Sequence, residues 1–276
     1  MPIREQSDDS NRDGIIWTHF DKTPIMSPYL VAFVVTDYVR VPTEDETINI
    51  WCRSILVPHI KFVQEIVQKS KKLLTEYTNS TSKVPKIDIV AHSFPIISTN
   101  WGLTIIGEIF LTYNESFDTI FDKLHVAQTT VHEMANLWLG NVVTPLWWIF
   151  KEWRIMEYFV IDIQQTMLQD INMNLSPITL KINNPIGPEK ILLNFIASIH
   201  NKAPAIVRML QHIITDEVFR NGLIKYLHTH QFSSATSDDL WNALQAVLDK
   251  SDVPHNAYRL KEVMDTWIKQ SDLISL

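Results

Sequence analysis

The chain has 276 residues, enough for one large domain or two small ones with a sizeable buried core. With 46% hydrophobic and 20% charged residues, its composition is that of a folded globular protein and argues against intrinsic disorder. The formal net charge of −7, without a Lys- or Arg-rich run, argues against nucleic-acid binding.

No compartment can be assigned from these features. Cys52 is the single cysteine, so no intrachain disulfide can form, and no run of about 18 apolar residues predicts a membrane span. The polar, acidic N-terminus is unlike a secretory signal. Sequons at Asn79, Asn114 and Asn174 would suit a secreted protein, but chance accounts for such sites equally well.

The first part of the chain is predicted to form β-strands. Apolar residues alternate over residues 29–35 and 48–53, and a polar turn at 42–46 separates the two segments. From residue 58 the apolar period becomes helical, and one apolar stripe continues through residue 77. The change of period predicts that the strands are followed by a helix from about residue 58.

The rest of the chain is predicted to contain two more strands and then mostly helices. The strands are expected at residues 86–92 and 103–113, and the helices at about 120–139 and 153–168. Thr236 should begin another helix, because acidic residues follow it in the first turn. A small sheet followed by a helical lobe indicates an α+β fold.

The predicted helix at 120–139 carries an altered zinc-binding motif. In His-Glu-x-x-His, two histidines four residues apart share one helix face and bind zinc, and the glutamate polarises the metal-bound water. This chain has His132 and Glu133 but places Asn136 at the second histidine. A neutral amide is a poor zinc ligand beside imidazole, so only His132 remains as a metal ligand in this motif.

The surroundings of the motif are similar to those in the aminopeptidase N type of zinc metallopeptidase. Residues 132–144 read HEMANLWLGNVVT, where the family has HELAHQWFGNLVT, and a Trp-Trp pair follows at 147–148. Residues 23–33 resemble the family segment TPMSTYLVAF, and residues 100–103 match the end of GAMENWGL. The resemblance extends over nearly the whole chain, from about residue 17 to residue 270.

This resemblance implies a domain organisation. Residues 1–57 correspond to the last strands of the family's N-terminal β-domain. Residues 58–276 correspond to a thermolysin-like metallopeptidase domain, a small mixed sheet with a helical lobe, which is incomplete relative to full-length members of the family.

The resemblance also locates the family's third zinc ligand. That ligand is a glutamate separated from the second histidine by eighteen intervening residues, and the position is occupied here by Ile155, which has no donor atom. Glu152 lies one helical turn earlier on the same face and is the nearest replacement. A solvated charge on the helix surface is the simpler interpretation of Glu152.

Two more functional positions of the family differ. Thr99 stands where the GAMEN glutamate binds the substrate's α-amino group, so that charge-assisted hydrogen bond is absent. His200 stands at the family's transition-state tyrosine, and a histidine can still donate a hydrogen bond to an oxyanion. Ile96 and Ile97 precede Thr99 in the same motif and are expected to crowd the cleft.

Three interpretations remain open. The favoured one is an aminopeptidase N-like protein that has lost zinc and peptidase activity and is retained as a binding module for peptides or a protein partner. In it Glu133 is a remnant general base, and no cofactor is expected although the family uses zinc. The alternative is an active zinc aminopeptidase that removes N-terminal residues from peptides with atypical ligands, such as His132 and Glu152. The third is a fragment or decayed product without a function of its own. Family members are commonly extracellular or membrane-anchored.

Overall fold

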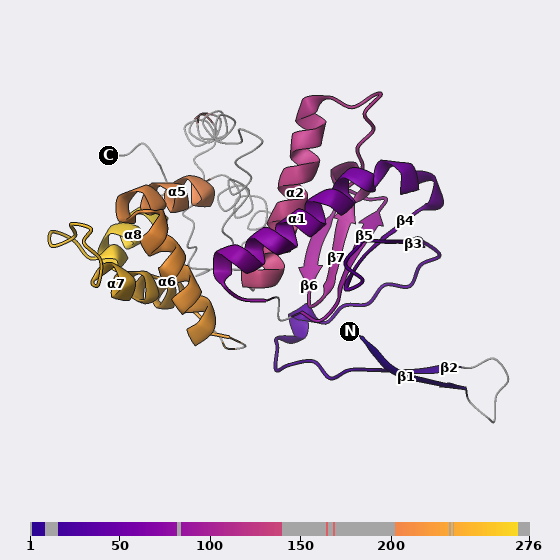
Figure 1. Ribbon diagram of the computed structural model, residues 1–276, viewed down its shortest axis with the longest axis horizontal. Coiled ribbons are helices and arrows are strands. Elements are labelled where there is room, and N and C mark those ends of the chain that lie inside the picture. Colours follow the sequence, from indigo (N-terminus) through magenta and orange to yellow (C-terminus); the bar gives the residue numbers. More distant parts are fainter. Residues whose placement is uncertain are drawn as a thin grey trace, which may run out of the picture. The chain divides into compact units, whose positions relative to one another are not determined.

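The computed structural model describes residues 2–8, 16–81, 84–139, 164, 168, 202–231, 233 and 235–269. The chain divides into two compact units, Met1–Val142 and Val143–Leu276. Strands and helices occur together, as Figure 1 shows, and the fold is α+β as predicted. No helix in the described ranges is long and apolar enough to cross a membrane.

The first unit is built on a five-stranded mixed sheet with the order β3-β4-β5-β7-β6. The strands are β3 (Val39–Pro42), β4 (Ile48–Cys52), β5 (Ile87–His92), β6 (Ile97–Asn100) and β7 (Leu103–Gly107). β5 pairs parallel with β4 and β7, whereas β3 and β6 pair antiparallel with their neighbours. Strands on both sides of residue 57 therefore belong to the same sheet.

Alternation along these strands creates the core of the first unit. Five isoleucines are at most 2% exposed: Ile48 and Ile50 of β4, Ile87 and Ile89 of β5, and Ile106 of β7. The two in β4 and the two in β5 are two residues apart and so share one face of their strand. The amphipathic helix α1 (Lys61–Thr78) crosses over the strands in Figure 1 and packs against α2 (Ile120–Leu139). Both helices were predicted from their apolar stripe or motif, and both are confirmed.

Two strand predictions are wrong in part or in whole. Residues 29–35 are not a strand: the 3-10 turn η1 (Pro28–Leu30) is followed by irregular chain in which Phe33 is 86% and Val35 is 90% exposed. A strand needs a hydrogen-bonding neighbour, and the sheet order places none of the described strands beside this segment. The strand expected at 103–113 ends at Gly107, where η3 (Glu108–Phe110) turns the chain away.

The N-terminus forms a separate two-stranded hairpin. β1 (Ile3–Asp8) and β2 (Ile16–Phe20) pair antiparallel with each other. The hairpin is small, and its Trp17 and Phe20 are more than half exposed.

After β4, the turn η2 (Ser54–His59) leads towards α1.

The described part of the second unit is helical, with α5 (Ala203–Ile214), α6 (Asp216–Thr229), α7 (Ser237–Leu248) and α8 (Leu260–Lys269). The predicted helix start at Thr236 is confirmed by a capping box, in which the Thr236 N–H donates to the Asp239 carboxylate at 2.8 Å. A Cβ at Gly222 of α6 would lie 2.9 Å from the Leu244 Cα, so glycine permits the close packing of α6 on α7. The helix predicted at 153–168 lies almost entirely outside the described residues.

An ion pair ties the turn before β4 to α1 and should make stability depend on pH. The Lys71 ammonium donates to Asp45, which also accepts from the Thr47 N–H at 3.0 Å. Burial raises the pKa of Asp45, but the hydrogen bonds from Lys71 and Thr47 outweigh it and hold the pKa below its ordinary value. A lowered folded-state pKa stabilises the fold above the unfolded-state pKa, and this contribution disappears as pH falls through the folded-state value.

We therefore expect Asp45→Asn to reduce the free energy of unfolding at pH 7 by about 0.5 kcal/mol, the usual size for a partly exposed pair. The difference from the unmodified chain should vanish below the folded-state pKa, and urea titrations at pH 7 and at progressively lower pH measure it. Glu46→Gln is the control, because it removes the same charge from an exposed side chain of the same turn. An equal loss at all pH values would contradict the assignment.

Candidate functional site

The motif residues lie where α2 contacts the edge strand β6 of the sheet. α2 contacts β6, the terminal strand in the sheet order, and this contact brings residues 34 positions apart in sequence together. Thr99 of β6 is paired with Thr104 of β7, whose side chain is on the buried face of the sheet at 1% exposure. Because cross-strand partners share a face, the Thr99 side chain points to the same face.

Thr99 and Asn136 both donate hydrogen bonds to Glu133. The Thr99 hydroxyl donates to Glu133 Oε2 in a short hydrogen bond, and Asn136 Nδ2 donates to the same oxygen at 3.1 Å. Asn136 can reach this oxygen because residues three apart are neighbours on a helix surface. Glu133 is 6% exposed, so its carboxylate meets these donors largely out of water.

His132 lies beside this carboxylate without a hydrogen bond to it. Its Nε2 is 3.8 Å from Glu133 Oε1, too far for a hydrogen bond. Burial lowers the pKa of His132, which favours the neutral imidazole at neutral pH. A neutral ring is the form that binds a metal, so His132 itself has kept the properties of a ligand.

The other groups at the motif do not fit a zinc site. A tetrahedral zinc site takes three or four nitrogen, sulfur or carboxylate donors. In the described part of the chain, no group of three His, Cys, Asp or Glu residues could hold a metal ion. Asn136, at the second ligand position, directs its amide N–H at Glu133 instead. Ile155 and Glu152, the predicted third position and its nearest replacement, lie outside the described residues.

Of the predicted site residues, the structure brings together Thr99, His132, Glu133 and Asn136, while His200 lies outside the described part. In the sequence, Thr99 and Asn136 are two separate replacements, and nothing in it predicts that they bind the same oxygen. The residue types themselves offered a signal, because threonine and asparagine both carry a hydrogen-bond donor and a glutamate carboxylate accepts hydrogen bonds.

The open edge of β6 is a second feature of this site. The Gly107 N–H donates to the Ile96 carbonyl at 2.8 Å, which makes Ile97 and Ile106 a non-hydrogen-bonded pair of the antiparallel ladder. The backbone groups of Ser98 and Asn100 then face β7, and those of Ile97 and Thr99 face away from it. Because β6 ends the sheet order, Ile97 and Thr99 present their backbone N–H and C=O groups at the open edge.

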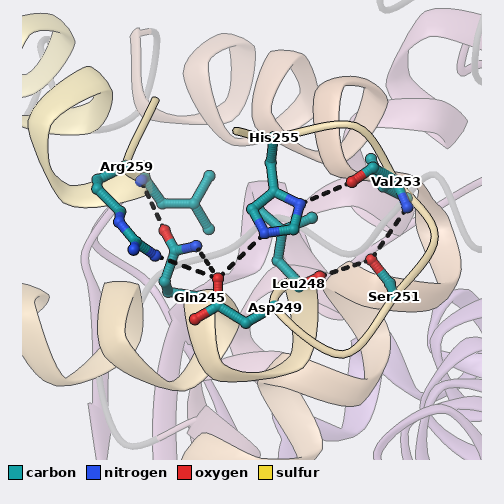
Figure 2. A network of polar contacts seen from close by, with 8 residues as sticks. Gln245, Leu248, Asp249, Ser251, Val253, His255 and Arg259 are labelled. Carbon is teal, nitrogen blue, oxygen red and sulfur yellow. Dashed lines mark hydrogen bonds and ion pairs between the residues drawn. The ribbon is translucent and has the colours of Figure 1, made fainter. Parts of the chain in front are cut away.

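A polar network in the second unit has a structural explanation. Asp249 Oδ1 accepts from Gln245 Nε2 at 2.7 Å and Arg259 NH1 at 3.2 Å, and lies 3.1 Å from His255 Nε2 (Figure 2). The Leu260 N–H donates to Gln245 Oε1 at 2.9 Å. These contacts hold the connection between α7 and α8 and border a cavity of about 450 Å³. The Asp249 carboxylate therefore stabilises the connection between α7 and α8.

Comparison with known proteins identifies the family. Residues 62–267 match the model of the peptidase family M1 domain. The chain is 31% identical to aminopeptidase N of Plutella xylostella and 30% identical to aminopeptidase M1 of Arabidopsis thaliana, in each case over 98% of this chain. It is 25% identical to aminopeptidase N of Mus musculus over 92% of its length.

The chain spans about a third of the length of these curated relatives, 31%, 32% and 29% respectively. The matched family domain covers most of the chain, including the sheet strands from β5 onward, α2 and the described helices of the second unit. The chain belongs to peptidase family M1 and is an aminopeptidase N-like member of it.

Proposed function

We propose that this chain is a non-catalytic member of its family, retained as a module that binds peptides or extended protein segments without cleaving them. The proposal depends most on one observation: the donors of Thr99 and Asn136 converge on Glu133 Oε2. Both positions, which the family resemblance assigns to substrate binding and to zinc, are engaged with the remnant general base.

The loss of zinc follows from the donors that remain. Tight zinc binding takes three or four protein donors, and His132 is the single family ligand retained at the three positions. Changing a group that merely supports a ligand already costs about 10–100-fold in metal affinity. Loss of two ligands, at Asn136 and Ile155, should cost far more.

The loss of catalysis follows from the loss of the metal. A glutamate in the position of Glu133 activates water when a metal ion has lowered the pKa of that water. Without the ion, the carboxylate is a hydrogen-bond acceptor for its neighbours. Thr99 offers no negative charge to a substrate's α-ammonium, so the interaction typical of aminopeptidases is absent as well.

Peptide binding is proposed at the open edge of β6. An extended peptide can add to an exposed edge strand through main-chain hydrogen bonds, with side-chain contacts supplying specificity. Ile97 and Thr99 supply backbone groups at this edge, and the Ile97 side chain is 46% exposed and available for apolar contact. The domains that the resemblance implies, residues 1–57 and 58–276, stay a prediction, since β3 and β4 share one sheet with strands that follow residue 57.

We expect the purified chain to contain no stoichiometric zinc at neutral pH. The physical reason is the ligand count, one family ligand in place of three. Elemental analysis after dialysis against metal-free buffer measures the content. About one zinc ion per chain would instead support the alternative, an active aminopeptidase with atypical ligands such as His132 and Glu152.

The unmodified chain should not cleave aminoacyl substrates. Restoring the two missing zinc ligands should recover metal binding but little activity. Asn136→His with Ile155→Glu rebuilds the family's ligand set, so zinc affinity should rise by more than about 100-fold. Activity on a leucyl substrate should stay poor, because Thr99 cannot bind the substrate ammonium. The matched control adds Glu133→Gln. Chelator-sensitive cleavage by the unmodified chain that is lost in Glu133→Gln would refute the proposal.

Peptide binding is tested with a fluorescent octapeptide of alternating alanine and leucine, by anisotropy. Ile97→Pro removes an outward N–H at the open edge and should weaken binding about tenfold, as expected for one lost main-chain hydrogen bond and a disturbed edge. Ser98→Ala is the control, because it changes a side chain of the same strand and keeps every backbone N–H, and it should bind like the unmodified chain. Equal affinity of Ile97→Pro and the unmodified chain would exclude this edge as the binding site.

A further inference from the structure

We propose that Thr99, Glu133 and Asn136 form a clasp that positions the open edge of β6. The three residues replace the catalytic arrangement of the family with a structural one, in which Thr99 is a positioning residue. The proposal deepens the peptide-binding function proposed above and rests on it for its purpose, although the clasp can be tested without a peptide.

Besides the clasp, β6 is supported by its pairing with β7 and by contact with η1, whose Leu30 carbonyl accepts from the Trp101 N–H at 3.1 Å just after the strand. β6 has four residues, Ile97–Asn100, and is bonded along one edge to β7. Within the described sheet no strand pairs with its other edge. Short terminal strands of this kind open more readily than central strands, since fewer hydrogen bonds and contacts oppose their opening.

Thr99 connects the open edge to the helix. Its backbone N–H and C=O face the open edge, while its hydroxyl donates to Glu133 of α2 on the buried face. A hydrogen bond from the side chain restricts the rotation of the residue, and so restricts the direction of its backbone groups. Residues whose side chains are locked in this way present their binding groups in a prepared orientation.

Asn136 holds the other half of the clasp in place. Its amide donates to the same Glu133 Oε2 at 3.1 Å from one turn further along α2. The carboxylate is thereby held between a donor on the strand and a donor on the helix. Hydrogen bonds to a charged acceptor are about twice as strong as neutral ones, and this carboxylate is 6% exposed.

The residue types at positions 99 and 136 both suit hydrogen bonding to one carboxylate. A glutamate at position 99, as in the family motif, would be a second carboxylate facing Glu133 and could not donate when ionised. Threonine supplies the donor that glutamate lacks. Asparagine at position 136 supplies a second amide donor within reach of the same oxygen, so the two replacements complement one carboxylate.

Amide hydrogen exchange of the full chain without ligand tests the clasp. Thr99→Val keeps the shape of the side chain and removes its donor, and it should raise exchange in the fragment containing Ile97–Asn100 by about tenfold or more. Exchange in β5, the central strand, should stay unchanged. Thr99→Ser keeps the hydroxyl and should remain within about twofold of the unmodified chain.

Asn136→Leu is the second variant, since it removes the other donor at nearly constant volume, and it should increase β6 exchange in the same direction. The clasp is wrong if β6 exchange is unchanged in both variants, or if β5 exchange rises as much as β6 exchange, because the contacts then support the whole unit. It is also wrong if Thr99→Ser behaves like Thr99→Val.

The alternating alanine and leucine octapeptide separates this proposal from the proposed function. Weaker binding by Thr99→Val that Thr99→Ser restores would show that the clasp prepares the edge for peptide. If the unmodified chain fails to bind the octapeptide, the peptide-binding function fails at this edge, while the exchange measurements still decide whether Thr99 positions β6.

Discussion

The buried carboxylate of Glu133 is the constraint on which the site depends. A carboxylate that is 6% exposed must be matched by donors, because an unmatched buried charge is costly. In a zincin the metal and its water meet that need. Here Thr99 and Asn136 meet it, one from the sheet and one from the helix itself. The same glutamate is thus compatible with two kinds of site, depending on what surrounds it.

His132 and Asn136 differ in how they relate to this carboxylate. His132 is neutral at neutral pH because it is buried, and it lies next to Glu133 without a hydrogen bond between them. Asn136, which stands at the position of the motif's second histidine, donates its amide N–H to this carboxylate. The fold of α2 and the sheet is compatible with either chemistry, in keeping with the rule that function resides in the site rather than in the fold.

Sheet topology is the second determinant. β6 stands at the end of the order β3-β4-β5-β7-β6, so the strand that carries Thr99 also has an open edge. The irregular segment after η1 illustrates the opposite case. Residues 31–35 are apolar enough for a strand but lie exposed, because none of the described strands pairs with them. An apolar sequence pattern favours a strand, but the strand forms only where a neighbouring strand can hydrogen-bond to it.

Periodicity and motif in the sequence alone determined helices α1 and α2, the start of α7 at Thr236, and the family, since each depends on residues close together in the chain. They also identified Thr99 and Asn136 as changed positions. The end of β7 at Gly107 and the irregular course of residues 31–35 were decided by tertiary structure, because the neighbours of a strand come from distant segments. The convergence of Thr99 and Asn136 on Glu133 was decided in the same way. Thr99 lies 34 residues from Glu133 in the chain, and only the packing of α2 on β6 brings the hydroxyl to the carboxylate.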